Sequence, residues 1–186
     1  MTLPLKRNNP KDAPSFFTVG HSTRTVDEFV ELLREAGVTQ VVDVRTVPRS
    51  RTNPQYNHDV FGDTLAGFQI GYEHIAALGG LRGKQHGVME SPNTFWENQS
   101  FRNYADYALS QTFREGLDRL RQIGALCRTG YMCVEAVWWR CHRRIITDYL
   151  LAPGEQVFHI LGSGHIDSAK MTPGARSDSQ GGLIYP

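Results

Sequence analysis

The sequence lacks most of the features that assign a protein to a class at first sight. It has no apolar run near the roughly 20 residues that a membrane-spanning helix requires. Basic side chains near the start are not followed by an apolar stretch, so we expect no secretory signal peptide and a cytoplasmic protein. There is no internal repeat and no Walker loop, GxGxxG, GxSxG or HExxH motif.

Charge imbalance is also absent, because 20 Lys and Arg residues face 19 Asp and Glu residues, for a net charge of +1. This balance excludes a strong overall attraction to nucleic acid or to an anionic membrane, although arginines gather in two short segments. The three cysteines cannot all pair with one another, and in a reducing compartment free thiols are expected. We expect Cys127 to be an ordinary buried residue.

What the chain does contain is an alternation of strand and helix patterns. Its 186 residues, 40% of them hydrophobic, suit one domain. The patterns predict strands at 15–21, 40–44, 71–74 and 156–161, and a further strand that begins near residue 125 and is completed by 132–136. They predict helices at 26–36, 59–68, 101–123 and 141–151. This order predicts an α/β domain from residue 15 onward, with a largely parallel sheet flanked by helices on both faces. Residues 1–14 are expected to form an extended arm.

Three local signals define the ends of the predicted helices. Thr25 and Glu28 form a capping box that starts the first helix, and Gly37 is suited to end it. Gly124 is expected to end the long helix at 101–123. The glycine- and serine-rich tail from Gly162 is expected, on composition, to be flexible.

Polar groups follow three of the predicted strands. These groups are His21 with Ser22, Asp43 with Arg45, and Cys133 with Glu135. The carboxyl ends of parallel strands lie at one edge of the sheet, where α/β proteins place their ligands. The sequence therefore predicts a polar pocket at this edge.

The run from Met132 to Arg144 contains the most reactive side chains. Cys133 lies at a strand-to-helix junction, where Arg140, Arg143 and a helix N-terminus would favour a thiolate nucleophile or redox centre. A buried thiol without chemistry is the alternative. Glu135 would face the same side and raise the pKa of the thiol, so it is either a general base or an ion-pair partner of Arg140 or Arg143.

The other two strand ends offer acid–base and anion-binding groups. Asp43 could orient a base or a ligand hydroxyl, and Arg45 could bind a phosphate or carboxylate, although an internal salt bridge between them is equally consistent. His21 is a candidate acid or base, with a hydrogen bond to the backbone as its structural alternative.

A metal site is not favoured by the spacing of Cys141 and His142. Cysteine and histidine are the usual zinc ligands, but Cys133 and Cys141 lie eight residues apart, without a CxxC pair. Adjacent side chains on the predicted helix 141–151 would also diverge by about 100°. We therefore predict no metal ligands, with zinc or iron as the alternative, and expect His142 to hydrogen-bond into the pocket. Trp138 borders the pocket or covers an edge of the core.

Five blocks in order resemble one protein family. They are TVGHSTRTVDEFVELL, VVDVRTVPRSR, LGG, CVEAVWWRCHRR and GARSDSQGGLIYP, and together they resemble the domain-of-unknown-function 488 family from about residue 16 to the C-terminus. The resemblance implies an α/β fold that includes the tail, hence one domain over 15–186, but it brings no established reaction. The motif positions that it implies are His21, Ser22, Asp43, Arg45, Pro48, Ser50, Cys133, Glu135, Cys141, His142 and Arg143.

These observations predict an enzyme that acts on a small anionic, nucleotide-like or phosphate-bearing substrate. The predicted catalytic residues are Cys133, Glu135, His21 and Asp43. The predicted substrate-binding residues are Ser22, Arg45, Ser50, Arg140, His142, Arg143 and Trp138. One alternative is a non-catalytic nucleic-acid-binding module that uses the basic loop 45–51 and the two tryptophans. The other is a metal-binding or structural protein. The enzyme hypothesis requires no cofactor, and no membrane partner is expected.

Overall fold

A six-stranded sheet forms the centre of the protein in the computed structural model, which describes residues 14–85 and 90–186. The strands are β1 (Ser15–Gly20), β2 (Gln40–Asp43), β3 (Gly71–His74), β4 (Thr129–Cys133), β5 (Gln156–Gly162) and β6 (His165–Ser168). They lie in the order β3-β2-β4-β1-β5-β6, parallel except for β6, which is antiparallel to β5. The predicted α/β class with a largely parallel sheet is confirmed. Of the predicted N-terminal arm, only Pro14 belongs to the described residues.

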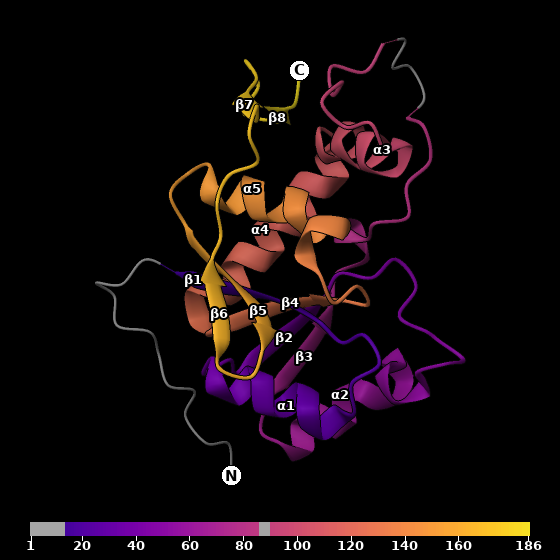
Figure 1. Ribbon diagram of the computed structural model, residues 1–186, viewed down its shortest axis with the longest axis vertical. Helices are drawn as coiled ribbons and strands as arrows, with labels where there is room; N and C mark the ends of the chain where they lie inside the picture. Colours follow the sequence, from indigo (N-terminus) through magenta and orange to yellow (C-terminus); the bar gives the residue numbers. More distant parts are fainter. Residues whose placement is uncertain (1–13, 86–89) are drawn as a thin grey trace.

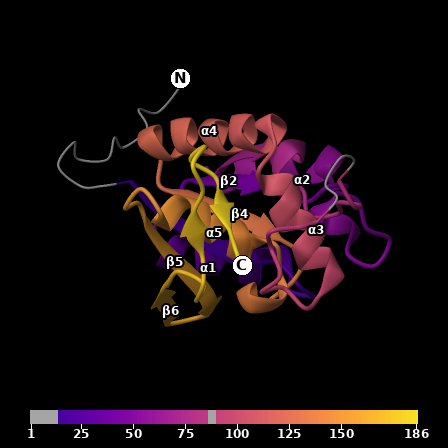
Figure 2. The ribbon, with the colours of Figure 1, turned by 90° about the horizontal axis from the view of Figure 1, so that it is seen from above.

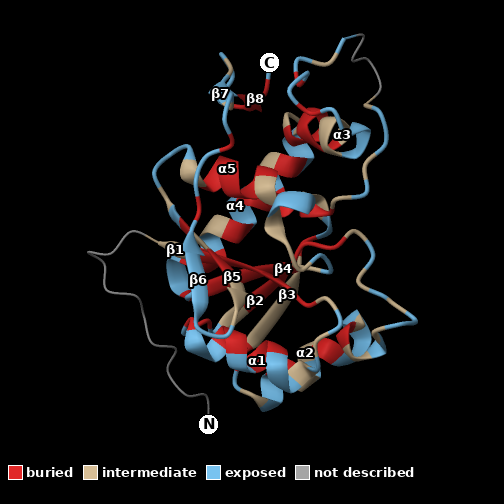
Figure 3. Ribbon diagram, in the orientation of Figure 1, coloured by how far each residue is buried: buried red, intermediate tan, exposed pale blue. Residues whose placement is uncertain are grey.

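Helices cover both faces of this sheet (Figure 1). They are α1 (Val26–Glu35), α2 (His58–Gly67), α3 (Gln99–Ala108), α4 (Gln111–Leu126) and α5 (Arg143–Leu151). Residues of α1 and α2 share one core cluster with the sheet, and residues of α3, α4 and α5 share the other. Seen from above, α3, α4 and α5 spread over their face of the sheet (Figure 2). Burial is concentrated in the central strands β1, β2 and β4 and on the inner sides of the helices, whereas β6 is exposed (Figure 3).

The first βαβ unit follows the local signals in the sequence. Thr25 caps α1 through its Oγ1, which accepts the Glu28 backbone N–H at 3.2 Å, while Glu28 Oε2 accepts the Thr25 backbone N–H at 2.7 Å. Gly37 follows the helix with a φ of 67°, in the left-handed region that favours glycine. The predicted capping box is confirmed.

The predicted single helix at 101–123 is wrong, because two helices occupy this segment. Ser110 interrupts it, and its Oγ accepts the Phe113 backbone N–H at 3.3 Å, which caps the start of α4. Gly124 does not end α4, which continues to Leu126. Instead, Gly124 packs against the ring of Phe16, where a Cβ atom would collide with the strand side chain.

The elements around the reactive run also differ from their predicted bounds. Strand β4 covers Thr129–Cys133 and ends three residues before the predicted boundary, because the chain then turns across Gly20, which has no Cβ to meet the Glu135 carbonyl. A 3₁₀ helix, Trp138–Arg140, follows, and α5 begins at Arg143 rather than at residue 141. Strand β5 is not the last strand, since β6 follows it after a tight turn.

The C-terminal tail packs onto the helical layer, although its composition suggested flexibility. It contains a two-stranded ribbon of β7 (Arg176–Ser177) and β8 (Leu183–Ile184). Tyr185 is buried, and its hydroxyl donates to Asp148 Oδ2 at 2.9 Å. A buried phenol with a satisfied hydroxyl anchors the tail.

The carboxyl ends of three parallel strands lie level at one edge of the sheet. Gly20 at the end of β1 is in register with Cys133 at the end of β4, and Asp43 at the end of β2 is in register with Met132. The loops that follow these strands therefore start side by side, as parallel pairing requires. Among the described residues, no helix is long and apolar enough to cross a membrane.

Candidate functional site

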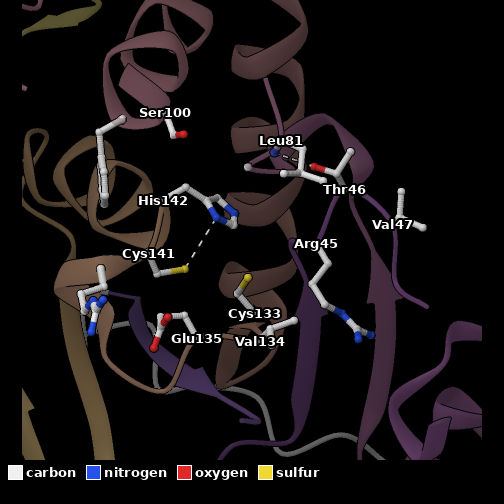
Figure 4. A pocket seen from close by; sticks show the side chains of 13 residues that line it. Arg45, Thr46, Val47, Leu81, Ser100, Cys133, Val134, Glu135, Cys141 and His142 are labelled. Atoms are coloured by element: carbon white, nitrogen blue, oxygen red, sulfur yellow. Dashed lines mark hydrogen bonds between the residues drawn. The ribbon is translucent and has the colours of Figure 1, made fainter. Parts of the chain in front are cut away.

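A cavity of about 380 Å³ opens beyond this edge of the sheet. Residues from five segments of the chain line it. They are Arg45, Thr46, Val47, Gly80, Leu81, Ser100, Phe101, Cys133, Val134, Glu135, Arg140, Cys141 and His142. Figure 4 shows the two sulfur atoms and the His142 ring facing one another on its wall.

Cys133, Cys141 and His142 form what we call the Cys/Cys/His cluster. Their two Sγ atoms and one imidazole nitrogen all lie within 4.8 Å of one another. Cys133 is the last residue of β4, and the other two residues lie between the 3₁₀ helix and α5. Cys141 has extended backbone angles, φ −125° and ψ 145°, so the two adjacent side chains converge. The expected divergence by about 100° is wrong, because α5 starts only after them.

The imidazole of His142 is held in one orientation. Its Nε2 lies 2.9 Å from the Val44 carbonyl oxygen, which can only accept, so Nε2 carries the proton. Nδ1 is then left with a lone pair and lies 3.6 Å from Cys141 Sγ. Gly80 lies against the other side of the ring, where any Cβ atom would come closer than 3.0 Å to Nδ1.

Cys141 is buried and Cys133 is partly buried, and a hydrogen bond joins the two thiols. Burial opposes ionisation of Cys141, but the hydrogen bond from Cys133 and the charge of Arg143 outweigh it and hold the pKa of the Cys141 thiol well below its usual range. The same hydrogen bond, together with burial, raises the pKa of Cys133 well above its usual range. Arg143 also donates from Nε to Cys141 Sγ at 3.3 Å.

Asp43 and Arg45 form an internal ion pair rather than an open anion site. Arg45 Nη2 lies 2.5 Å from Asp43 Oδ2 and 2.6 Å from the Tyr56 carbonyl oxygen, and Tyr72 donates its hydroxyl to the same carboxylate at 2.7 Å. Both charged side chains are buried. Arg45 contributes to the cavity wall, but Figure 4 shows its guanidinium directed away from the sulfurs.

His21 lies behind this ion pair and does not line the cavity. Its ring stacks on Tyr56 with centroids 4.1 Å apart, and Nδ1 donates to the Ser22 carbonyl oxygen at 2.9 Å. Burial lowers the pKa of His21 to about 4. The imidazole is therefore neutral at physiological pH. Ser22 has a φ of 49°, and its N–H donates to the Val134 carbonyl oxygen at 2.8 Å.

The remaining predicted residues fall into two groups. Glu135 and Arg140 line the cavity, and both are exposed. Arg143 is buried, with one guanidinium nitrogen bonded to the Glu135 carbonyl oxygen. Trp138 stacks on His159 with centroids 4.2 Å apart. Ser50 accepts backbone N–H groups in its own loop and does not line the cavity.

Several cavity residues carried no clear signal in the sequence. Val47, Leu81 and Val134 are exposed aliphatic side chains at the rim, and single apolar residues in loops give no pattern to detect. The Gly79–Gly80 pair is consistent with a close approach of backbone to another group, but a pair of glycines more often simply makes a turn. Here Gly80 approaches the His142 ring, which packs against it.

A comparison with protein-family models identifies the family of this chain. The model of the domain of unknown function DUF488 matches residues 25–150. The chain belongs to this family. The DUF488 match contains the whole Cys/Cys/His cluster and the Asp43–Arg45 pair, whereas His21, Ser22 and the tail lie outside it. No curated protein and no solved structure matches the chain.

Proposed function

We propose that this DUF488 protein is an enzyme whose reaction takes place at the Cys/Cys/His cluster. The observation that carries the proposal is the convergence of two thiols and an imidazole on the wall of one open cavity. Reactive groups of this kind, buried on one side and accessible on the other, are typical of active sites. Glu135, on the same wall, supplies a carboxylate for proton transfer.

The substrate in this proposal is a small phosphate-bearing or nucleotide-like anion. Arg45 and Arg143 use their guanidinium groups for internal hydrogen bonds, so Arg140 is the cavity arginine left to bind an anion. Within residues 14–85 and 90–186, Arg140 forms no ion pair. An arginine fork binds phosphate oxygens in a bidentate manner.

An apolar rim supports a substrate with a flat or apolar portion beside its charge. Val47, Leu81 and Val134 line the cavity while 62%, 77% and 46% exposed. Covering these side chains removes apolar surface from water, which favours a ligand that carries a base or similar ring. The combination of Arg140 and this rim fits a nucleotide better than inorganic phosphate.

The nucleic-acid-binding alternative receives less support from the side chains that it needs. Arg45 is held in a buried ion pair, Arg49 lies 3.6 Å from Asp59, and Trp138 is stacked on His159. These contacts reduce the cationic and aromatic surface available to a polynucleotide. Binding to single-stranded DNA that weakens steeply with salt would favour this alternative.

The proposal is tested by turnover assays with nucleoside phosphates, phosphomonoesters and phosphodiesters. Cys141→Ser is expected to lower kcat/KM by at least about 100-fold, as expected when a reacting group is lost. Cys127→Ser is the control, because this buried thiol lies outside the cavity. Arg140→Ala is expected to raise KM about tenfold for charged substrates, the equivalent of one modest ion pair. Full activity in both Cys133→Ser and Cys141→Ser would contradict the proposal.

A further inference from the structure

The Cys/Cys/His cluster has the dimensions of a tetrahedral metal site. With zinc–sulfur distances near 2.3 Å and zinc–nitrogen distances near 2.0 Å, neighbouring sulfur and nitrogen ligands lie about 3.5 Å apart. Cys141 Sγ and His142 Nδ1 are 3.6 Å apart, and Cys133 Sγ completes a triangle within 4.8 Å. Small side-chain rotations therefore suffice to bring all three donors onto one ion.

The hydrogen bond of His142 prepares the nitrogen that would bind the ion. Histidines that ligate metals usually donate their other ring N–H to a carbonyl or carboxylate, which fixes the tautomer. Here Nε2–H donates to the Val44 carbonyl oxygen at 2.9 Å, and the Nδ1 lone pair faces the sulfurs. Gly80 leaves the space in which the ring can hold this orientation.

The surroundings of the sulfurs also suit thiolate ligands. Arg143 Nε–H donates to Cys141 Sγ, and the Val134 backbone N–H bonds to Cys133. Two thiolates and one divalent cation sum to zero charge, which lowers the cost of burying the group. The alternative arrangement, one nucleophilic cysteine activated by a histidine base, needs only one thiol. It gives no role to the second cysteine of the cluster, whereas a metal ion uses both.

We propose that Cys133 Sγ, Cys141 Sγ and His142 Nδ1 bind one divalent cation of the zinc class, with a further coordination position open to the cavity. The inference rests on the proposed function, since it names the cofactor of the same site. Thiolate and imidazole ligands select zinc or a related soft ion over magnesium or calcium. Three protein ligands beside an open cavity are the pattern of a catalytic rather than a structural site. The ion would polarise a phosphate oxygen or a bound water there.

Titration of the reduced, metal-free full chain with cobalt(II) tests the inference. One ion per chain is expected to bind, with a thiolate-to-cobalt charge-transfer band and the visible spectrum of tetrahedral cobalt. Zinc is expected to displace the cobalt. Bound zinc is also expected to protect Cys133 and Cys141 from alkylation, as mapped by mass spectrometry, and to leave the alkylation of Cys127 unchanged. Both readouts use the wild-type chain, so they do not depend on the folding of a variant.

Variants then locate the site. Cys133→Ser, Cys141→Ser and His142→Gln are each expected to weaken cobalt binding by at least about 100-fold, the upper range found for loss of supporting groups around a metal. Cys127→Ser is expected to bind as the wild type does. No charge-transfer band in the wild type, or equal affinity in all variants, would overturn the inference.

The two proposals fail in different ways. If the wild type binds no metal but alkylation of Cys141 abolishes turnover, the metal inference falls and the proposed enzyme stands. If the metal binds as described but turnover survives in the cysteine variants, the proposed function falls and the metal site stands.

Discussion

Replacing Gly80 by alanine is the sharpest perturbation of the cluster that leaves its three donors in place. A Cβ atom at this position would lie closer than 3.0 Å to Nδ1, Cγ and Cε1 of His142. Contacts between such atoms need about 3.5 Å, so the ring must retreat by about 1 Å or the loop must shift. The Val44 carbonyl hydrogen bond on the other side of the ring opposes that retreat.

A shift of this size is expected to lower cobalt affinity about 10- to 100-fold and turnover by about 100-fold. Overpacking is expected to cost about 1–3 kcal/mol of unfolding free energy, measured by urea denaturation. Gly83→Ala is the matched control, because a Cβ atom there meets nothing within 4 Å. Equal cobalt affinity and turnover in the two variants would refute the reasoning that Gly80 positions His142.

Two further predictions concern the buried polar groups behind the cavity. Asp43→Ala leaves the buried guanidinium of Arg45 without its carboxylate, and urea denaturation is expected to show a loss of about 3–5 kcal/mol, whereas a loss below about 1 kcal/mol would contradict a buried ion pair. His159 is buried, and its pKa is lowered to about 4, so as the pH falls from 6.5 the unfolded chain takes up a proton that the folded chain refuses. Between pH 6.5 and pH 4, His159 thus lowers the free energy of unfolding by up to about 3 kcal/mol. His159→Asn keeps an N–H that can bond to Thr18, and it is expected to make the free energy of unfolding fall less steeply over this pH range. An unchanged dependence of the unfolding free energy on pH would contradict the prediction.

The parts of the fold that depend on local signals could be predicted from the sequence. Thr25 and Glu28 cap α1 because their side chains reach backbone groups three residues away. The alternation of strands and helices predicted a parallel sheet, and parallel pairing brings the strand ends at Gly20 and Cys133 level. The polar edge of the sheet was thus predictable before any contact was known.

The parts that depend on a single side chain or on packing could not be predicted. Ser110 divides the long helical pattern, although the apolar periodicity runs on through it. The extended backbone at Cys141, set by the preceding 3₁₀ helix, turns two adjacent side chains toward one ion-sized space. Spacing rules for metal motifs assume a standard loop or helix, and this turn is neither.

The residue that binds the anion in the proposed function could not be predicted from the sequence either. Arginines at 45, 140 and 143 were equivalent in the sequence, but burial and hydrogen bonds separate them. Arg45 pairs with the Asp43 carboxylate, and Arg143 donates a hydrogen bond to the Cys141 sulfur. Of the three arginines, only Arg140 is both exposed and part of the cavity wall. Which charge is free depends on tertiary contacts that sequence position does not encode.

The most direct test of the account is X-ray absorption at the zinc edge on the zinc-loaded, reduced protein. The account predicts two sulfur neighbours at about 2.3 Å and one imidazole nitrogen at about 2.0 Å, with the remaining position filled by oxygen from water or ligand. The sulfur count is expected to fall to one in Cys133→Ser and to stay at two in Cys127→Ser. A spectrum with no sulfur neighbours in the wild-type protein would contradict the assignment of the Cys/Cys/His cluster as a metal site.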